Sequence, residues 1–465
     1  MSTRISHIPF YGRMPIRDRT LFVWTLAFTM VLAALLYWKP MFGIAFGLAP
    51  LVLLLVSHGQ SAIYLLIAAT FLFLPMDIGL VLLPADIAAA ILIAAYLLDV
   101  FVHGPSRHGN PLARPFFLYT GVVFLSVALE GFTALSVRYL LRQILLLTSF
   151  LAVAHFGHRV NVKRVLLVFM AAAIANSCYS VMQFFALGGS TRAFGLAGRG
   201  YGDHVMLGFL ISVIFYLWTS DIRGRIFWGL SSLLMVGAVA ATQTRASALT
   251  AMWGLVIIIP LALRAGKHLL SNVPRKGLWA AIVLGILILP VLFLYTPLFE
   301  GITDRFARMG FQATGTILLR LSLWKAALAA FWAHPIFGIG AGNFAQVANW
   351  VPGVRFDPVF YHVSGLSTHV VILSALTETG LIGVSALLYF LARAVKISYR
   401  DFTGTARDNE IPVTLSLFVI ALVIFGSSLY AGSWFWGNNS YHMAVFFGLM
   451  VSHRARPAPL YPRET

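Results

Sequence analysis

Long apolar runs separated by short polar segments make up most of the chain. The runs are about 16–25 residues long, which is close to the length that a helix needs to cross the hydrocarbon core of a bilayer. Because every backbone polar group must be paired inside lipid, runs of this length favour helices. The pattern predicts an all-α polytopic membrane protein with about 12–14 transmembrane helices. The runs lie near residues 21–38, 41–56, 61–75, 78–102, 115–130, 138–157, 163–187, 203–219, 225–241, 246–263, 277–297, 367–392, 412–432 and 439–452.

The composition agrees with a chain that meets lipid rather than water. Hydrophobic residues make up 60% of the sequence and charged residues 10%. A soluble chain carries about a quarter charged residues and needs them to cover its surface. These values exclude a soluble enzyme, a disordered protein and a secreted disulfide scaffold. The single cysteine, Cys178, lies within an apolar run and can form no intramolecular disulfide.

Lysine and arginine are distributed unevenly between the two sides of the predicted bundle. If the N-terminus is inside, about two thirds of the 33 basic residues fall on the cytoplasmic side, although the longest loop lies outside. This is the positive-inside bias, so we expect a multi-pass protein with both termini in the cytoplasm. The formal net charge of +18 is then a topology signal, and no nucleic-acid partner is expected. The first apolar run is too long for a signal-peptide core, so no cleavable signal is expected.

One external loop, residues 295–367, is far longer than the other connections. Long loops in compact proteins usually have a function. Within this loop, Thr316–Ala333 is apolar but carries Arg320 and one further basic residue, which predicts a helix lying in the membrane interface. The glycine-rich segment Gly338–Asn343 follows it. We therefore expect one membrane domain over residues 1–465, in which this loop caps a site.

Rare polar residues gather in three segments on the external side. They surround Arg192, Arg245 and His369, each close to the end of an apolar run. Each alone has an ordinary explanation, because arginines near helix ends reach lipid headgroups and a histidine can cap a helix. Their coincidence on one side favours a site for an anionic group with a titratable base beside it. A guanidinium group suits pyrophosphate because it stays charged and makes bidentate contacts.

A longer set of motifs follows in order along the chain. It comprises Arg192 with Gly195, Thr-Arg245-Ala-Ser, Arg320-x-x-x-Trp324, Pro335-Ile-Phe-Gly-Ile-Gly-Ala-Gly-Asn-Phe344, and His369 followed by Glu378-Thr-Gly-Leu-Ile-Gly383. This combination resembles the superfamily of O-antigen ligases and Wzy-type polysaccharide polymerases, most strongly over residues 190–395. Val370 stands where family members often carry asparagine, and Gly202-Asp-His204 stands where they commonly have Pro-Asn.

The resemblance implies a glycosyltransferase at the periplasmic face of the bacterial inner membrane. Its donor is a glycan on undecaprenyl pyrophosphate, and the transfer inverts the anomeric centre without a metal. No cofactor is implied. His369 matches the position of the general base, and Arg192 and Arg245 are expected to bind the donor pyrophosphate. Arg320 and Trp324, four residues apart on one helix face, are expected to contribute to substrate binding.

Three functions stay open. The first is a polymerase that extends exopolysaccharide or O-antigen repeat units, and the second is a ligase that moves a finished glycan to lipid A-core. The third is a flippase or other transporter of lipid-linked oligosaccharide. Transporters tend to show inverted repeats and polar residues at mid-membrane, whereas the polar residues here gather on one side, which favours the polymerase and the ligase. Membrane lipids are expected partners in each case.

Other ionisable residues have competing interpretations. His204 and His362 are rivals of His369 for the role of base. Glu378 follows His369 by nine residues, which places it on the opposite side of a continuous helix. It is therefore expected to be a polar contact inside the bundle. Asp86 is the carboxylate that a transporter could use at depth in the membrane.

Overall fold

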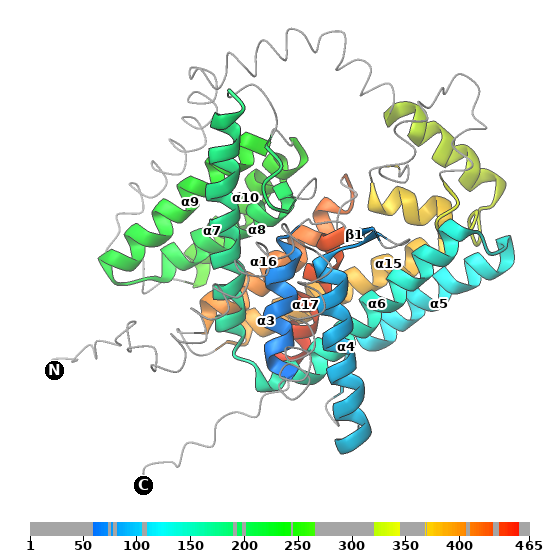
Figure 1. Ribbon diagram of the computed structural model, residues 1–465, viewed down its shortest axis with the longest axis horizontal. Coiled ribbons are helices and arrows are strands. Elements are labelled where there is room, and N and C mark those ends of the chain that lie inside the picture. The colour runs from blue at the N-terminus through cyan, green and yellow to red at the C-terminus, as the bar shows by residue number, and fades with distance from the viewer. Residues whose placement is uncertain are drawn as a thin grey trace.

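The computed structural model describes a bundle of helices (Figure 1). The described residues are 59–72, 76–77, 81–104, 109–188, 193–197, 201–242, 245–265, 320–344, 368, 370–405, 410–430 and 437–454. The predicted runs near 21–38, 41–56 and 277–297 lie outside these residues.

The described helices agree with the predicted apolar runs. By length and composition, six of them can cross a membrane, and several others are shorter apolar helices. The prediction of an all-α polytopic membrane protein is confirmed. The helices are α3 (Gly59–Thr70), α4 (Pro84–His103), α5 (Ala113–Glu130), α6 (Ala134–Phe156), the 3-10 helix η1 (Gly157–Arg159), α7 (Val162–Ala186), α8 (Tyr201–Trp218), α9 (Ile222–Thr242), α10 (Arg245–Ala265), α15 (Val371–Thr403), α16 (Ile411–Ser427) and α17 (Gly437–Arg454); residues 320–333 form a further helix.

Two predicted runs, 61–75 and 78–102, have different inner boundaries in the structure. The first helix already ends at Thr70, and the second begins only at Pro84. Proline has no N–H to donate, so it is accepted at the first helical position. The carboxylate of Asp86 then accepts the N–H of the preceding Leu83 at 2.8 Å and caps the helix start. Between the two helices, the two-residue strands β1 (Met76–Asp77) and β2 (Val81–Leu82) pair antiparallel.

Helix α15 also differs from its predicted run, which ended at residue 392. The helix continues to Thr403, through a segment that carries several basic residues. Hydropathy marks only the part that meets lipid, whereas a polar segment can extend a helix beyond the membrane. The helix is also broken at Gly380, where φ is 66° and ψ is −166°.

Polar contacts show which helix ends lie together. The Tyr441 hydroxyl in the first turn of α17 donates to Asp86 at the start of α4 at 2.7 Å. The next residue, His442, has its Nε2 2.6 Å from the hydroxyl of Thr70 at the end of α3. One end of the bundle thus contains the starts of some helices and the ends of the others. The starts are those of α4, α6, α8, α10, α15 and α17, and the ends are those of α3, α5, α7, α9 and α16. We call this end of the bundle the capped end, because residues 320–344 pack there.

Helices α16 and α17 form the centre of the core. The described side chains of α17 from Asn439 to Ser452 are all buried, and so are those of α16 from Ile411 to Ala421. Helices that are buried on every side belong in the interior of a bundle. Figure 1 shows α17 in the middle of the fold, between α3 and α4. The first two turns of α17 are therefore held firmly in place by the helices around them.

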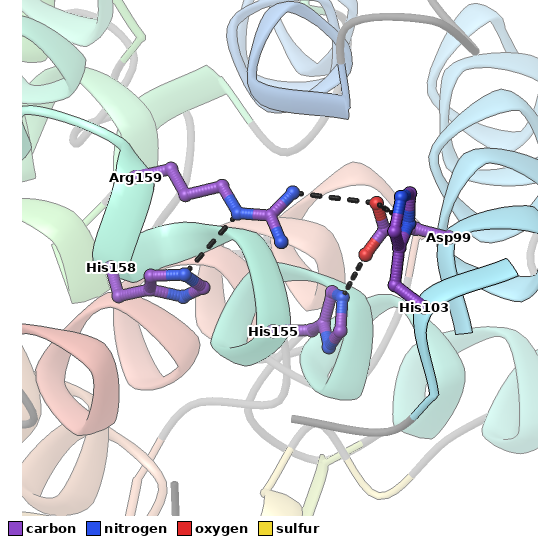
Figure 2. Close-up of polar contacts among 5 residues, drawn as sticks. All are labelled: Asp99, His103, His155, His158 and Arg159. Carbon is purple, nitrogen blue, oxygen red and sulfur yellow. Dashed lines mark hydrogen bonds and ion pairs between the residues drawn. The ribbon is translucent and has the colours of Figure 1, made fainter. Parts of the chain in front are cut away.

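At the opposite end, a cluster of polar contacts joins α4 to the end of α6 and to η1 (Figure 2). The Asp99 carboxylate lies 2.6 Å from His155 Nε2 and 3.3 Å from an Arg159 guanidinium nitrogen. His103, one turn further along α4, contacts the same carboxylate at 3.3 Å. Asp99 and His103 belong to α4, His155 to the end of α6 and Arg159 to η1, so this cluster holds α4 to the end of α6 and to η1.

Candidate functional site

The glycine-rich segment 335–344 packs against the break in α15. In a continuous helix the N–H of Leu381 would bond to the carbonyl of Thr377. Instead it donates to the carbonyl of Pro335 at 2.9 Å, and the freed Thr377 carbonyl accepts the N–H of Ile339 at 3.1 Å. The motifs Pro335–Phe344 and Glu378–Gly383 thus form one structural unit, in which segment 335–344 replaces a hydrogen bond of the helix.

Two glycines make this close approach possible. Gly338 and Gly380 have φ angles of 72° and 66°, in the left-handed region that L side chains rarely adopt. A Cβ atom on Gly338 would lie 2.3 Å from the carbonyl carbon of Glu378, and one on Gly380 would lie 2.2 Å from the carbonyl oxygen of Ile336. Neither contact can be relieved by turning a side chain, because both partners are backbone atoms.

Gly380→Ala is therefore expected to destabilise the protein. The left-handed conformation and the backbone clash together lower the free energy of unfolding by about 2–5 kcal/mol. Thermal melting of the purified protein in detergent measures the effect. Gly237→Ala is the matched control, because a Cβ at this position of α9 meets nothing within 4 Å. Equal melting temperatures for Gly380→Ala and wild type would contradict the packing described above.

Glu378 is buried at this junction, with 5% of its surface exposed. Its carboxylate accepts the backbone N–H groups of Gly342 and Phe344. The Ser126 hydroxyl of α5 lies 2.6 Å from the Glu378 carbonyl and 2.7 Å from that of Phe337. The interpretation of Glu378 as a polar contact inside the bundle agrees with these bonds, since the residue binds the glycine-rich segment to α15.

The backbone on both sides of His369 is fixed, although His369 itself lies outside the described residues. The Trp324 indole N–H donates to the Thr368 carbonyl at 3.0 Å. The buried Thr368 hydroxyl donates to the Val370 carbonyl at 2.8 Å and lies 2.7 Å from the hydroxyl of Ser374. These contacts hold the chain where it enters α15 at the capped end.

Arg320 and Trp324 lie one turn apart in the helix formed by residues 320–333. This helix covers the described part of the predicted interfacial segment 316–333. Arg320 is exposed, and Trp324 is 37% exposed. Among the residues that the structure describes, no carboxylate pairs with Arg320.

The short segment after α7 is held by side chains and by the end of α9. The Gln183 side-chain oxygen accepts the N–H groups of Phe194 and Gly195, both at 3.0 Å. The N–H of Ala193 donates to the carbonyl of Ala241 at 3.1 Å. The segment that carries the first arginine motif is therefore attached to the end of α9, directly before the second arginine motif.

Each of the two predicted arginines is near, in sequence, one residue of the Ala193–Ala241 hydrogen bond. Arg192 directly precedes Ala193, and Arg245 begins α10 four residues after Ala241. Because consecutive Cα atoms are only about 3.8 Å apart, a few residues of chain keep each arginine near the Ala193–Ala241 hydrogen bond. Arg192 and the side chain of Arg245 lie outside the described part of the chain.

The start of α10 is linked to the start of α15 through the end of α16. The hydroxyl of Thr250 in α10 bonds to the hydroxyl of Tyr430, which follows α16. The Ser428 carbonyl, two residues earlier, accepts the N–H of Ile372 in α15 at 3.3 Å. The second arginine motif and the chain that leads to His369 therefore share one corner of the capped end.

The carboxylate of Asp203 also lies at this corner. Asp203 in the first turn of α8 accepts the Ser247 hydroxyl of α10 at 3.0 Å and the Asn439 amide of α17 at 3.2 Å. The three residues are far apart in the sequence, and no shared motif signals their contact. The one sign of it in the sequence was that Gly202-Asp-His204 stands where members of the resembled superfamily commonly have Pro-Asn.

His204 is fully buried, with 0% of its surface exposed. Its ring packs against that of His442, with 4.4 Å between the ring centroids, and against Phe71. A substrate hydroxyl cannot reach such a ring, so His204 does not fit the role of a general base. The other rival, His362, lies outside the described residues. Within the described ranges, no group of three or more His, Cys, Asp or Glu side chains is arranged so that it could hold a metal ion.

The apolar helices, with polar contacts and motif residues gathered at one end, define a polytopic membrane protein with a candidate site at that end. Residues 230–388 match the family model described as O-Antigen ligase. This match confirms the resemblance to the superfamily of O-antigen ligases and polysaccharide polymerases. It covers about a third of the chain and includes Arg245, Arg320, Trp324 and His369, but not Arg192. None of the curated proteins matches the chain.

Proposed function

We propose that the protein is a glycosyltransferase that extends exopolysaccharide or O-antigen repeat units at the periplasmic face of the inner membrane. Its donor is a glycan on undecaprenyl pyrophosphate, and residues 295–367 cap the site. The observation that carries the proposal is the meeting of three chain segments at the capped end, those next to Arg192, Arg245 and His369. The match over residues 230–388 supports the same class of enzyme.

The arginines hold the donor in this proposal. As the glycosidic bond to the carrier breaks, negative charge develops on the pyrophosphate oxygens of the leaving group. Guanidinium groups at Arg192 and Arg245 stabilise that charge without a metal, because each can make two parallel hydrogen bonds to phosphate oxygens. Arg320 is a weaker candidate for the same role, since its helix reaches the capped end from the loop.

His369 acts as the general base. A neutral imidazole takes the proton from the acceptor hydroxyl while that oxygen attacks the anomeric carbon. The bond between the anomeric carbon and the pyrophosphate breaks on the opposite face, so the configuration inverts and undecaprenyl pyrophosphate leaves. Thr368 and Trp324 support this role by fixing the chain next to His369, and the exposed part of Trp324 can also contact the glycan or its prenyl chain.

A ligase with the same chemistry is the alternative, with lipid A-core in place of a growing glycan as the acceptor. Deletion of the gene distinguishes the two. Loss of a polymerase leaves single repeat units, whereas loss of a ligase leaves lipid-linked polymer intact but removes O-antigen from lipid A. Single repeat units are the result that the proposal predicts.

A flippase or other transporter is less well supported by the structure. Asp86, the carboxylate considered for proton transfer in such a protein, caps α4 and accepts the Tyr441 hydroxyl. Both contacts are structural and lie at the capped end. A transporter would also form no longer glycan when purified protein meets lipid-linked repeat units.

The sidedness of the proposal can be tested with reporter fusions. A reporter fused near Gly353 is expected to behave as periplasmic, and one fused near Lys267 as cytoplasmic, because the basic residues favour that orientation. Alkaline phosphatase and green fluorescent protein give opposite signals on the two sides. The reverse pattern would place the capped end in the cytoplasm and remove access to a periplasmic acceptor.

A further inference from the structure

The Asp203 carboxylate connects three helices at the capped end. Ser247 of α10 donates to one of its oxygens at 3.0 Å, and Asn439 of α17 donates to the other at 3.2 Å. Ser247 and Asn439 are buried, with exposed fractions of 0% and 2%. We infer that Asp203 is a positioning residue that sets the start of α10, and with it Arg245, relative to the rest of the site. The role of Arg245 in this inference depends on the proposed function.

The α17 side of the contact is firmly held. Directly after Asn439 and Ser440, Tyr441 bonds to Asp86 of α4 and His442 to Thr70 of α3. The side chains of this part of α17 are buried on all sides. A bond from Asp203 to Asn439 therefore attaches α8 to the central helix of the bundle.

The α10 side of the contact is peripheral. Leu249, Met252 and Val256 of this helix are exposed by 53%, 56% and 61%, so one face of α10 points away from the bundle. A helix packed on one side only is free to tilt or slide unless directional bonds fix it. Ser247 supplies such a bond two residues after Arg245, and Thr250 supplies another to Tyr430.

The sign of the charge also indicates positioning rather than a direct contact with the donor. A carboxylate would repel pyrophosphate, so Asp203 is a poor ligand for the phosphate groups. Near the start of α10, however, a negative charge is favourable because the helix dipole is positive there. Asp203 thus stabilises the helix end that carries Arg245.

The test compares Asp203→Leu with Asp203→Asn in the full-length protein, purified into lipid nanodiscs. Asparagine can still accept from Ser247, and its amide can donate to Asn439 once the Asn439 amide turns over. Hydrogen exchange of the α10 amides after Ser247 measures the position of the helix, and titration with undecaprenyl pyrophosphate measures donor binding. Asp221→Leu is the matched control, because Asp221 caps α9 at the opposite end through the Gly224 N–H at 3.0 Å.

We expect Asp203→Leu to accelerate exchange at the start of α10 and to weaken undecaprenyl pyrophosphate binding by about tenfold or more, because two buried donors lose their acceptor. Asp203→Asn should stay close to wild type in both measurements. Ser247→Ala removes one hydroxyl without adding bulk and should change both in the same direction as Asp203→Leu, but less. Asp203→Leu combined with Arg245→Ala should bind no more weakly than Arg245→Ala alone, since Asp203 acts through Arg245.

Unchanged exchange in both Asp203→Leu and Ser247→Ala would overturn the inference. An equal loss of binding in Asp203→Asn and Asp203→Leu would also overturn it, because the charge would then act on the ligand directly. If wild type forms no glycan or binds no undecaprenyl pyrophosphate, the proposed function fails, and the exchange measurement alone decides the positioning role.

Discussion

His369→Ala is expected to reduce glycan transfer by about 10²–10⁴-fold, the usual contribution of a general base. This corresponds to about 3–5.5 kcal/mol of activation free energy. The variant should fold, insert and bind the lipid-linked donor, because contacts of Thr368 and Trp324 hold this part of the chain. Initial rates with purified protein and lipid-linked repeat units measure the change, and donor titration measures binding separately.

His362→Ala is the matched control for this prediction, since it removes a histidine only seven residues earlier in the chain. Its transfer rate should remain near that of wild type. Retention of more than about a tenth of wild-type transfer by His369→Ala would rule out His369 as the base, because that is well outside the range for a lost base.

Arg192→Lys and Arg245→Lys are expected to lower transfer by about 10–100-fold each. Lysine keeps the charge but offers a point donor, so the paired hydrogen bonds to phosphate oxygens are lost. Hydrogen bonds to charged groups contribute about 1.5–3 kcal/mol, which sets this range. The loss should appear in transfer rate and in affinity for undecaprenyl pyrophosphate.

Arg138→Lys provides the comparison for the arginine variants. Arg138 is exposed in the first turns of α6 at the capped end, and no described carboxylate pairs with it. An arginine that only reaches lipid headgroups tolerates lysine, so this variant should transfer glycan like wild type. If Arg192→Lys and Arg245→Lys also behave like wild type, both arginines are lipid contacts and the anion site is refuted.

Hydropathy predicted most of the described helices because the same apolar length is needed to cross the membrane wherever a helix lies in the bundle. The predicted helix boundaries were wrong where features other than apolar length determine where a helix begins or ends. Pro84 delays the start of α4, and basic residues that hydropathy excludes continue α15 as far as Thr403. The break at Gly380 is a tertiary feature, because it exists only where segment 335–344 supplies replacement hydrogen bonds.

The candidate site was predictable only as a set of segments. The distribution of charge and the predicted topology placed Arg192, Arg245 and His369 on one side of the membrane. In the structure, the described residues next to each of them lie at the capped end. The contacts that fix these segments could not be read from the sequence. Asp203 finds its partners 44 and 236 residues away, and such pairings follow from helix packing rather than from any local pattern.

The most direct test of the central claim is reconstitution. Purified wild-type protein in liposomes is incubated with lipid-linked repeat units and no other enzyme or metal, and the products are resolved by glycan length. We predict a ladder of longer glycans with release of undecaprenyl pyrophosphate, and loss of that ladder in His369→Ala. Binding of the lipid-linked donor without any longer glycan would contradict the account.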